Sequence, residues 1–266
     1  MKTAKSAALA FVFSVVTLHS VAFGQCGTPA PTRDPQGVVV LNQMAAATGW
    51  SAPNLPTDAI AKGTVTTAGK DNTLNVTVKI KGPGLLRTDI QETSSSTIVN
   101  NGQGAVITPD SARFLPDVSA LAIRAFTLPV FSDVGVAATD GNLSVAYLGK
   151  HIVNGQDTQK IQIARQFDPC SPLAAAYSII SPITVWVDAS SALPVQIQYT
   201  QTAADNQNAS SSRIRQFSNY KAVNGIAVAF TQVEVMNGQT SATWQLNDVQ
   251  FNAGLTDGDF ALPKGQ

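Results

Sequence analysis

The stretch Leu193-Pro-Val-Gln-Ile-Gln-Tyr199 decides the fold class, because its apolar residues alternate with proline or glutamine. A period of two places one row of side chains on a buried face and is typical of a half-buried β-strand. The preceding stretch Ile183–Asp188 alternates in the same way, and the four residues Ala189-Ser-Ser-Ala192 suit a tight connection. We therefore predict a β-hairpin here, followed by further antiparallel strands.

After this hairpin come, in order, Phe217-Ser-Asn-Tyr220, Val223-Asn-Gly225, Asn237-Gly238, the stretch from Trp244 to Phe251 and Asp257-Gly-Asp-Phe-Ala-Leu-Pro263. This order of features resembles the periplasmic lipoprotein-carrier superfamily of LolA-like and LolB-like proteins. The resemblance implies a half-open barrel whose concave, apolar side is covered by an N-terminal helix and a helical lid, with acyl chains held between them. An arginine helps to hold the lid closed in these carriers, but we assign no residue of this chain to that role.

Residues 1–24 have the pattern of a secretory signal peptide. Lys2 and Lys5 precede an uncharged apolar run, and Ala22-Phe-Gly24 supplies the small residues of a processing site. A membrane anchor is the alternative, but the run is barely long enough to span a bilayer and no basic cluster follows it. We expect an exported, periplasmic protein that begins at Gln25 and has no transmembrane span after processing.

Cys26 and Cys170 are the two cysteines of the chain. Lipid anchoring at Cys26 is disfavoured, because lipoprotein processing needs a small residue before the cysteine and Gln25 stands there. Two cysteines of an exported chain usually pair, so we favour a disulfide between Cys26 and Cys170 over two free thiols.

Charge and length exclude several classes of function. The chain has 17 basic and 17 acidic side chains and no basic cluster, which argues against a nucleic-acid partner. Its 266 residues suit one all-β domain. A barrel in the outer membrane is an alternative use of amphipathic strands, but Pro263 and Gly265 would spoil the terminal membrane strand that such a barrel needs.

The remaining sequence predicts a mainly β protein with a strongly curved antiparallel sheet, a half-open β-barrel of about nine to eleven strands covered by two short helices. The first helix begins at Asp34-Pro35, an N-cap followed by a first-turn proline, and ends at Gly49. The second is predicted over residues 116–130, where apolar residues recur at helical spacing. Prolines favour a loop over residues 167–181, and polar residues favour a mobile surface loop over residues 202–212.

These elements divide the chain into three parts. We expect the signal peptide over residues 1–24, an N-terminal linker and helix over residues 25–56, and a curved antiparallel β domain over residues 57–266. The helix near residues 116–130 is an insertion in that domain.

A search for catalytic and metal-binding motifs is negative. The chain contains no Gly-x-Ser-x-Gly, His-Glu-x-x-His or Cys-x-x-Cys motif. His151 has no neighbouring partner pattern, so a structural or surface role is favoured over a thiol-based hydrolase that would combine it with Cys170. Asp257-Gly-Asp259 has too few alternating ligands for a calcium loop and is predicted to be a turn. We predict no enzyme, no metal and no cofactor.

Two functions remain open. The first is a carrier or sensor that binds a lipid, a lipoprotein acyl chain or another apolar ligand in the concave face of the sheet. The second is a non-catalytic scaffold of the cell envelope that has a closed core and binds a protein partner. Unfilled space between sheet and helices would favour the carrier, and a packed centre would favour the scaffold. The candidate cavity residues are Leu74, Val76, Val78, Leu121, Phe126, Val185, Val195, Ile197, Tyr199, Trp244 and Leu246.

Overall fold

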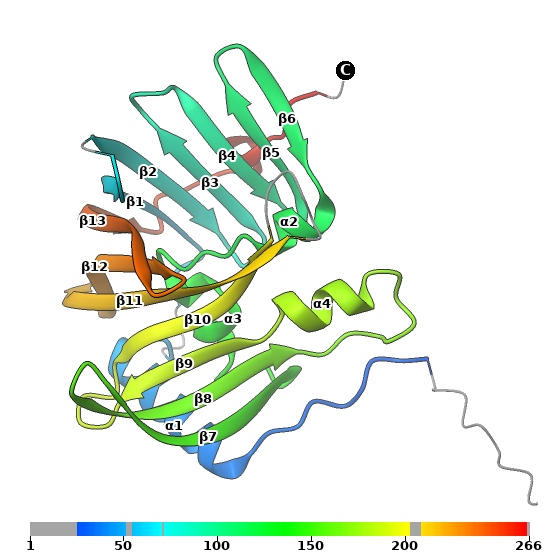
Figure 1. Cartoon of the computed structure of the whole chain (residues 1–266), viewed down its shortest axis with the longest axis vertical. Coiled ribbons are helices and arrows are strands. Elements are labelled where there is room, and N and C mark those ends of the chain that lie inside the picture. The colour runs from blue at the N-terminus through cyan, green and yellow to red at the C-terminus, as the bar shows by residue number, and fades with distance from the viewer. Residues whose placement is uncertain (1–25, 52–54, 71, 203–208, 265–266) are drawn as a thin grey trace, which may run out of the picture.

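The computed structural model describes residues 26–51, 55–70, 72–202 and 209–264. In these residues thirteen antiparallel strands form one strongly curved sheet that does not close into a barrel (Figure 1). Two meanders build the sheet, β1 to β6 and β7 to β13, and they join where β1 pairs with β13. The predicted fold class is confirmed. The predicted signal peptide lies outside the described residues.

The N-terminal meander runs from the centre of the sheet to one edge. Its strands are β1 (Asp58–Thr67), β2 (Thr73–Lys81), β3 (Leu85–Ile90), β4 (Ser95–Asn100), β5 (Gln103–Thr108) and β6 (Ser111–Leu115). In β2 the buried side chains of Val76, Val78 and Ile80 alternate with half-buried polar ones, as the sequence predicts. The sequence analysis does not predict β6, whose five residues are too few for a clear pattern and of which residues 111–114 are exposed in the structure.

The C-terminal meander runs from the opposite edge back to the centre. Its strands are β7 (Leu143–Val153), β8 (Gln156–Arg165), β9 (Ile183–Asp188), β10 (Pro194–Thr202), β11 (Ser210–Val223), β12 (Ile226–Met236) and β13 (Gln239–Phe251). The described part of the sheet therefore has thirteen strands, more than the about nine to eleven that the sequence indicates.

The predicted hairpin is formed by β9 and β10 and closes through residues 189–193. Asp188 stabilises its turn, because the carboxylate accepts hydrogen bonds from the backbone N–H and hydroxyl groups of Ser190 and Ser191 at 2.6–3.1 Å. The hydrogen bonds from Ser190 and Ser191 lower the pKa of the Asp188 carboxyl to about 2. The turn is thus held most strongly when Asp188 is ionised.

Strand β10 departs from the strict alternation that its sequence predicts. Pro194 pairs with Val187 but Gln196 pairs with Trp186, so the intervening Val195 forms a β-bulge. The bulge shifts the register of the side chains, and Pro194 and Gln196 are buried while Val195 is only half-buried. Alternation alone does not reveal this, because the bulge is set by pairing with the neighbouring strand.

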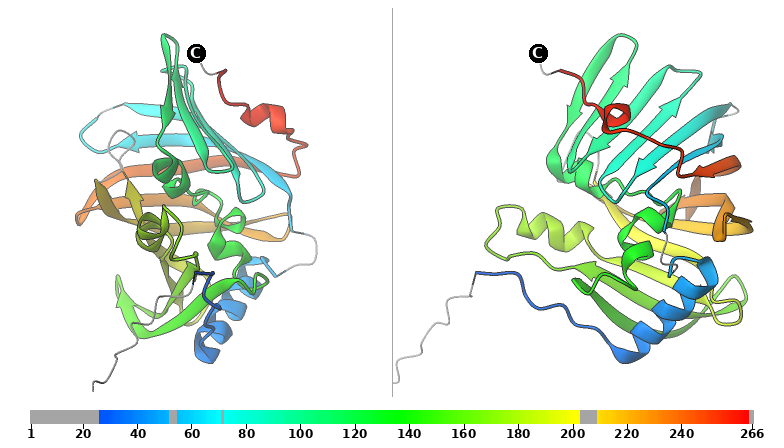
Figure 2. Two further views of the ribbon diagram at one scale, coloured as in Figure 1. Left: turned by 90° about the vertical axis from the view of Figure 1, so that its right-hand side faces the viewer. Right: turned by 180° about the vertical axis from the view of Figure 1, so that it is seen from behind.

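Helix α1 (Pro35–Thr48) forms where the sequence predicts it. The Asp34 side chain caps its N-terminus by accepting a hydrogen bond from the Gly37 N–H at 2.9 Å, and Gly49 ends it with a φ of 78°. A Cβ at position 49 would lie 2.2 Å from the Gly225 carbonyl oxygen, so only glycine fits there. The helix packs across β7, β8 and β12 (Figure 2). Its buried apolar side chains are Val40, Leu41, Met44 and Ala45.

A connecting segment, residues 116–142, joins the two meanders and crosses the concave side of the sheet (Figure 1). The single helix predicted over residues 116–130 is wrong. Helix α2 (Asp117–Ala122) is short, irregular residues 123–128 with a turn follow it, and η1 (Pro129–Phe131) and α3 (Asp133–Val136) complete the helical parts. Proline at position 129 removes a helical donor and disfavours helical backbone at the preceding residue, which prevents one helix from running through it.

Two predicted loops also need correction. Residues 167–181 contain helix α4 (Ala174–Ile180), so the loop prediction is wrong there. Proline is tolerated just before a helix, and the three alanines that begin α4 are strong helix formers. The predicted loop over residues 202–212 is too long, because Thr202 belongs to β10 and Ser210 begins β11, while residues 203–208 lie outside the described ranges.

The N-terminal segment before α1 is fixed to the C-terminal meander. Cys26 and Cys170 form the predicted disulfide, with their Cα atoms 5.5 Å apart. The Arg33 guanidinium donates to three backbone carbonyl oxygens within residues 137–143 at 3.0–3.1 Å. Within the described residues, no helix is both long and apolar enough to cross a membrane.

Candidate ligand-binding site

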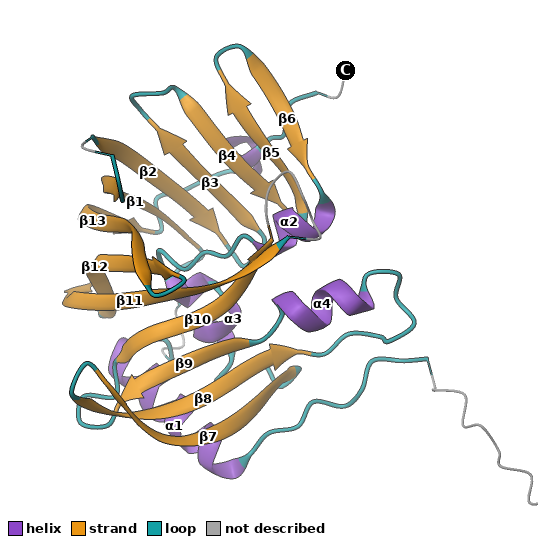
Figure 3. Cartoon of the chain, in the orientation of Figure 1, coloured by secondary structure: helices purple, strands orange, loops and turns teal. Residues whose placement is uncertain are grey.

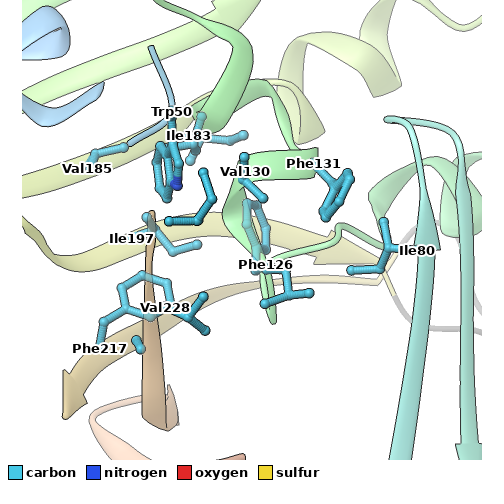
Figure 4. Close-up of a cluster of buried hydrophobic side chains, with 14 of the residues drawn as sticks. Trp50, Ile80, Phe126, Val130, Phe131, Ile183, Val185, Ile197, Phe217 and Val228 are labelled. Atoms are coloured by element: carbon cyan, nitrogen blue, oxygen red, sulfur yellow. The ribbon is translucent and has the colours of Figure 1, made fainter. Parts of the chain in front are cut away.

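The centre of the concave side is filled by the chain itself. Phe126, Val130 and Phe131 of the connecting segment lie among buried sheet side chains such as Ile197 (Figure 4). The ring centroids of Phe126 and Tyr199 are 4.4 Å apart. Packing of this kind fills much of the concave face, so a ligand would need the spaces that remain beside it.

Most of the cavity residues predicted from the sequence lie in this packed core. The predicted residues that belong to this core are Val76, Val78, Phe126, Val185, Ile197, Tyr199 and Leu246. Leu74 and Trp244 are half-buried and pack against the core. Phe126, Tyr199 and Trp244 also line a space of about 270 Å³. Leu121 belongs to a second apolar cluster, and Val195 is in neither of the two clusters that the described residues form.

An open cleft of about 780 Å³ lies beside the packed centre. It separates the turn between β2 and β3 from the end of β8 and from α4. This volume is in the range of small-molecule sites, about 300–1,000 Å³. Its apolar lining consists of Pro83, Leu85, Leu121, Phe167, Tyr177 and Ile180.

Helices α2 and α4, drawn in purple in Figure 3, contact each other. Leu121 of α2 and Tyr177 of α4 both line the cleft. Val118 and Ile180 are buried between them, and Leu121 and Tyr177 pack against this second cluster. The ring of Tyr177 stacks on that of Phe167 with centroids 4.1 Å apart. Because α2 follows the N-terminal meander and α4 belongs to the C-terminal one, the second cluster joins the two halves of the sheet.

Charged groups complete the lining of the cleft. The Arg165 guanidinium lies 2.7 Å from Asp133 Oδ1 and 3.4 Å from Asp140 Oδ2, so it forms ion pairs with both carboxylates. The Arg124 guanidinium donates to the backbone oxygen of Leu121, and burial lowers its pKa. None of the ion pairs that the described residues form includes Arg124.

A second space of about 270 Å³, the inner cavity, adjoins the cleft at Arg124, which lines both. It lies between residues 122–127 and side chains of β3 and of β10 to β13. The Glu234 carboxylate binds Arg213 Nη1 at 3.0 Å and Arg215 Nη2 at 2.7 Å. The Tyr199 hydroxyl also donates to Glu234, at 3.2 Å. The inner cavity is therefore a polar, charged space next to an apolar one.

Arg215 and Glu234 stay charged although both side chains are largely buried. Only 9% of the Arg215 side chain is exposed. Burial alone would raise the pKa of the Glu234 carboxyl, but Arg215 and Arg213 hold it below its ordinary value. Burial raises the pKa of the Tyr199 hydroxyl, which stays protonated and can donate. Glu234 is therefore an ionised carboxylate that already has its partners.

The sequence search missed the charged residues of the site and its aromatic pair. Arg215 and Phe217 are two residues apart on β11 and are both buried, so a period of two does place Arg215 on an inner face. A charged residue on a face that is otherwise apolar was the signal that could have identified this site. Phe167 and Tyr177 had no comparable signal, because they are brought together only by α4.

The other motifs that the sequence singled out have structural explanations. His151 is exposed on β7, and its ring lies 3.4 Å from the Leu148 carbonyl oxygen. Asp257 and Asp259 begin and cap the short helix η2 (Asp257–Phe260), and their carboxylates pair with lysines of β2. Among the described residues, no group of three or more His, Cys, Asp or Glu side chains is placed to hold a metal ion.

Solved structures of other proteins share this fold. A domain from Vibrio parahaemolyticus named for outer membrane lipoprotein sorting has a TM-score of 0.54 and 16% identity, over 85% of this chain and 96% of that one. A LolA superfamily protein from Nitrosomonas europaea has a TM-score of 0.53 and 10% identity, with coverages of 85% and 97%. A DUF1329 family protein from Desulfovibrio piger has a TM-score of 0.52 and 12% identity, with the same coverages.

No family model and no curated protein matches the chain by sequence. The structural matches confirm the resemblance to the LolA-like superfamily at the level of the fold. Since a shared fold does not fix a function, the function is argued from the cleft and its residues.

Proposed function

We propose that this protein is an exported binding protein that takes an apolar ligand, such as a lipid or a lipoprotein acyl chain, into the open cleft. The observation that carries the proposal is the unfilled volume of about 780 Å³ beside a centre that is otherwise packed. Each CH₂ group that a ligand buried there would contribute about 0.8 kcal/mol of binding free energy. The apolar side chains that would contact it come from both halves of the sheet.

The proposal places the ligand at the side of the sheet, whereas the sequence suggested the middle of the concave face. A scaffold with a closed core would need the packed centre alone. The cleft has no evident role in such a scaffold, whereas a carrier needs an apolar surface that its own chain leaves uncovered. We therefore favour the carrier or sensor over the scaffold.

Export is supported by the Cys26–Cys170 disulfide, because disulfides persist in oxidising compartments. The pattern of residues 1–24 points the same way. We propose cleavage after Gly24 and a periplasmic mature chain made of the linker and helix over residues 25–56 and the β domain over residues 57–266.

Native mass spectrometry of the protein, purified gently from its own cell envelope, tests the proposal. We expect co-purifying lipid or acylated peptide. Leu121→Asp should remove it, because the charge would lie in the apolar lining of the cleft. Leu148→Asp is the matched control, since Leu148 is 41% exposed on β7 and lies outside the cleft.

Circular dichroism of both variants establishes that each is folded before its ligand content is compared. A native protein that carries no lipid and takes up no fluorescent fatty acid contradicts the proposal and supports the scaffold. Equal loss of ligand in both variants also contradicts it, because the site would then not be the cleft.

A further inference from the structure

The inner cavity has more positive than negative charge. Three guanidinium groups line it, those of Arg124, Arg213 and Arg215, against the single carboxylate of Glu234. Arg213 and Arg215 both bind Glu234, so each oxygen of that carboxylate already has an ion-pair partner. No ion pair within the described residues neutralises Arg124. The cavity therefore attracts a negatively charged group.

Two buried donors in the lining of the inner cavity have no acceptor. They are the Nε–H of Arg215 and the Nε1–H of Trp244, and neither has a hydrogen-bond partner within the described residues. The Arg215 guanidinium lies 5.4 Å from the centre of the Trp244 ring, so the two side chains are neighbours. A buried donor without an acceptor destabilises a protein by about 1–3 kcal/mol. Both donor atoms are buried, so an acceptor in the cavity would remove that penalty once a small side-chain movement let it reach them.

The carboxylates nearest to Arg124 do not cancel this attraction. Asp133 is the carboxylate that acts most on the Arg124 guanidinium, but it is paired with Arg165 at 2.7 Å. Asp140 is held by the same arginine. Arg165 and Arg124 together balance the two carboxylates at the entrance, so the net positive charge of the inner cavity comes from Arg213 and Arg215 against the single Glu234.

Arg124 lines both the cleft and the inner cavity. The lining of the cleft includes apolar side chains such as Leu85, Leu121 and Phe167, and the lining of the cavity includes three guanidinium groups. A molecule that extends through both spaces would need an apolar chain at one end and oxygen acceptors with negative charge at the other. The cavity volume of about 270 Å³ is enough for a headgroup rather than a whole ligand.

We propose that the inner cavity binds the oxyanion headgroup, a carboxylate or a phosphate, of an amphiphile whose apolar chain occupies the cleft. This inference rests on the proposed function, since it assigns a headgroup to the ligand of the same site. Arg124 contacts the headgroup at the entrance, and Arg215 and Trp244 donate to its oxygens. Arginine suits this role because its planar donors match carboxylate and phosphate oxygens.

Isothermal titration calorimetry of the delipidated protein tests the inference with two twelve-carbon ligands, dodecanoate and dodecanol. They share the apolar chain and differ in the charged headgroup. We expect dodecanoate to bind at least about tenfold more tightly, which is the effect of one additional charge-assisted hydrogen bond. Acetate and inorganic phosphate, titrated separately, supply the headgroup chemistry without a chain and should bind far more weakly than dodecanoate.

Three variants locate the effect. Arg124→Gln should weaken dodecanoate binding about tenfold and leave dodecanol binding unchanged. Arg113→Gln, which removes the same charge from the exposed edge strand β6, should change neither affinity. Trp244→Phe removes one donor that has no acceptor, so it should preserve stability and weaken only dodecanoate binding.

The outcomes separate this inference from the proposed function. Equal affinities for acid and alcohol, or dodecanoate binding that Arg124→Gln leaves unchanged, overturn the headgroup site while the apolar cleft stands. Acetate or phosphate binding as tightly as dodecanoate shows an anion site that needs no chain, which overturns the amphiphile. Failure of the native protein to bind either twelve-carbon ligand overturns both proposals.

Discussion

The centre of the curved sheet and its mouth, by which we mean the side where the open cleft lies, are covered in different ways. At the centre, Phe126 and Phe131 of the connecting segment fill the space above the strands. At the mouth, Phe167 and Tyr177 stack on each other at the wall of a cleft that stays open. The same amphipathic sheet thus presents an inner face that the chain fills in one place and leaves free in another.

The two regions also differ in charge. The core at the centre is apolar, whereas the inner cavity near the mouth contains the buried Arg215 and its partner Glu234. Burying such a pair requires strong compensation and is weak evidence for stability by itself. The difference indicates that the centre holds the fold together, and it is consistent with the binding site that we propose at the mouth.

The largest expected effect comes from truncating one phenylalanine in each region. Phe126→Ala should lower the free energy of unfolding by about 3–5 kcal/mol, because the side chain is 1% exposed and its loss leaves a cavity. Phe167→Ala should lower it by about 1 kcal/mol or less, because the ring lines an open cleft. Urea unfolding of both variants measures the difference. Equal losses would mean that the mouth is packed like the centre.

Breaking the disulfide near the mouth should lower the stability of the protein. Cys26 and Cys170 are separated by 144 residues, and Cys170 lies shortly before α4. Replacing both by serine should lower the free energy of unfolding by about 2–4 kcal/mol, since the unfolded chain gains conformational freedom. Calorimetry with and without reductant checks this on the native protein. An unchanged unfolding temperature would show that the cross-link contributes nothing to stability.

The turn of the β9–β10 hairpin provides a stability effect outside the cleft. The pKa of Asp188 falls from 3.8 to about 2 on folding, so its contribution is fully present above the unfolded pKa and is lost as the pH falls toward 2. Asp188→Asn should therefore lower the free energy of unfolding by about 1–2 kcal/mol at neutral pH, and by less below about pH 3.

Urea unfolding at both pH values checks this prediction, with fatty-acid uptake as a second readout that should not change. A stability difference that is the same at both pH values would show that the Asp188 charge is not involved. Reduced uptake would show that the turn and the cleft are coupled.

The smallest expected effect is at an exposed ion pair beside the cleft. Lys81 Nζ lies 2.6 Å from Asp257 Oδ1, but the Asp257 side chain is 81% exposed. Asp257→Asn should change the free energy of unfolding by less than about 0.5 kcal/mol, because solvent and salt screen such pairs. Chemical denaturation in low and high salt measures this. A larger loss of unfolding free energy that does not depend on salt would contradict the view that this ion pair is solvated.

The sequence predicted the sheet better than it predicted the site. Alternation found β2 and β9, and capping residues found both ends of α1, because these signals are local. The bulge at Val195 depends on how β10 pairs with β9, which the alternation of β10 alone does not reveal. For the same reason, apolar positions such as Val185 could be assigned to an inner face, but whether that face is covered by protein or by a ligand depends on the path of the connecting segment.

Photo-cross-linking with a diazirine-bearing fatty acid, followed by peptide mapping, tests the central claim most directly. If the mouth of the sheet is the binding site, label should concentrate on residues 82–85, on Leu121 and on residues 167–180, and unlabelled dodecanoate should compete it away. Label on peptides of α1 and β7, or spread over the surface without competition, would contradict the claim that the open cleft is where this protein binds an apolar chain.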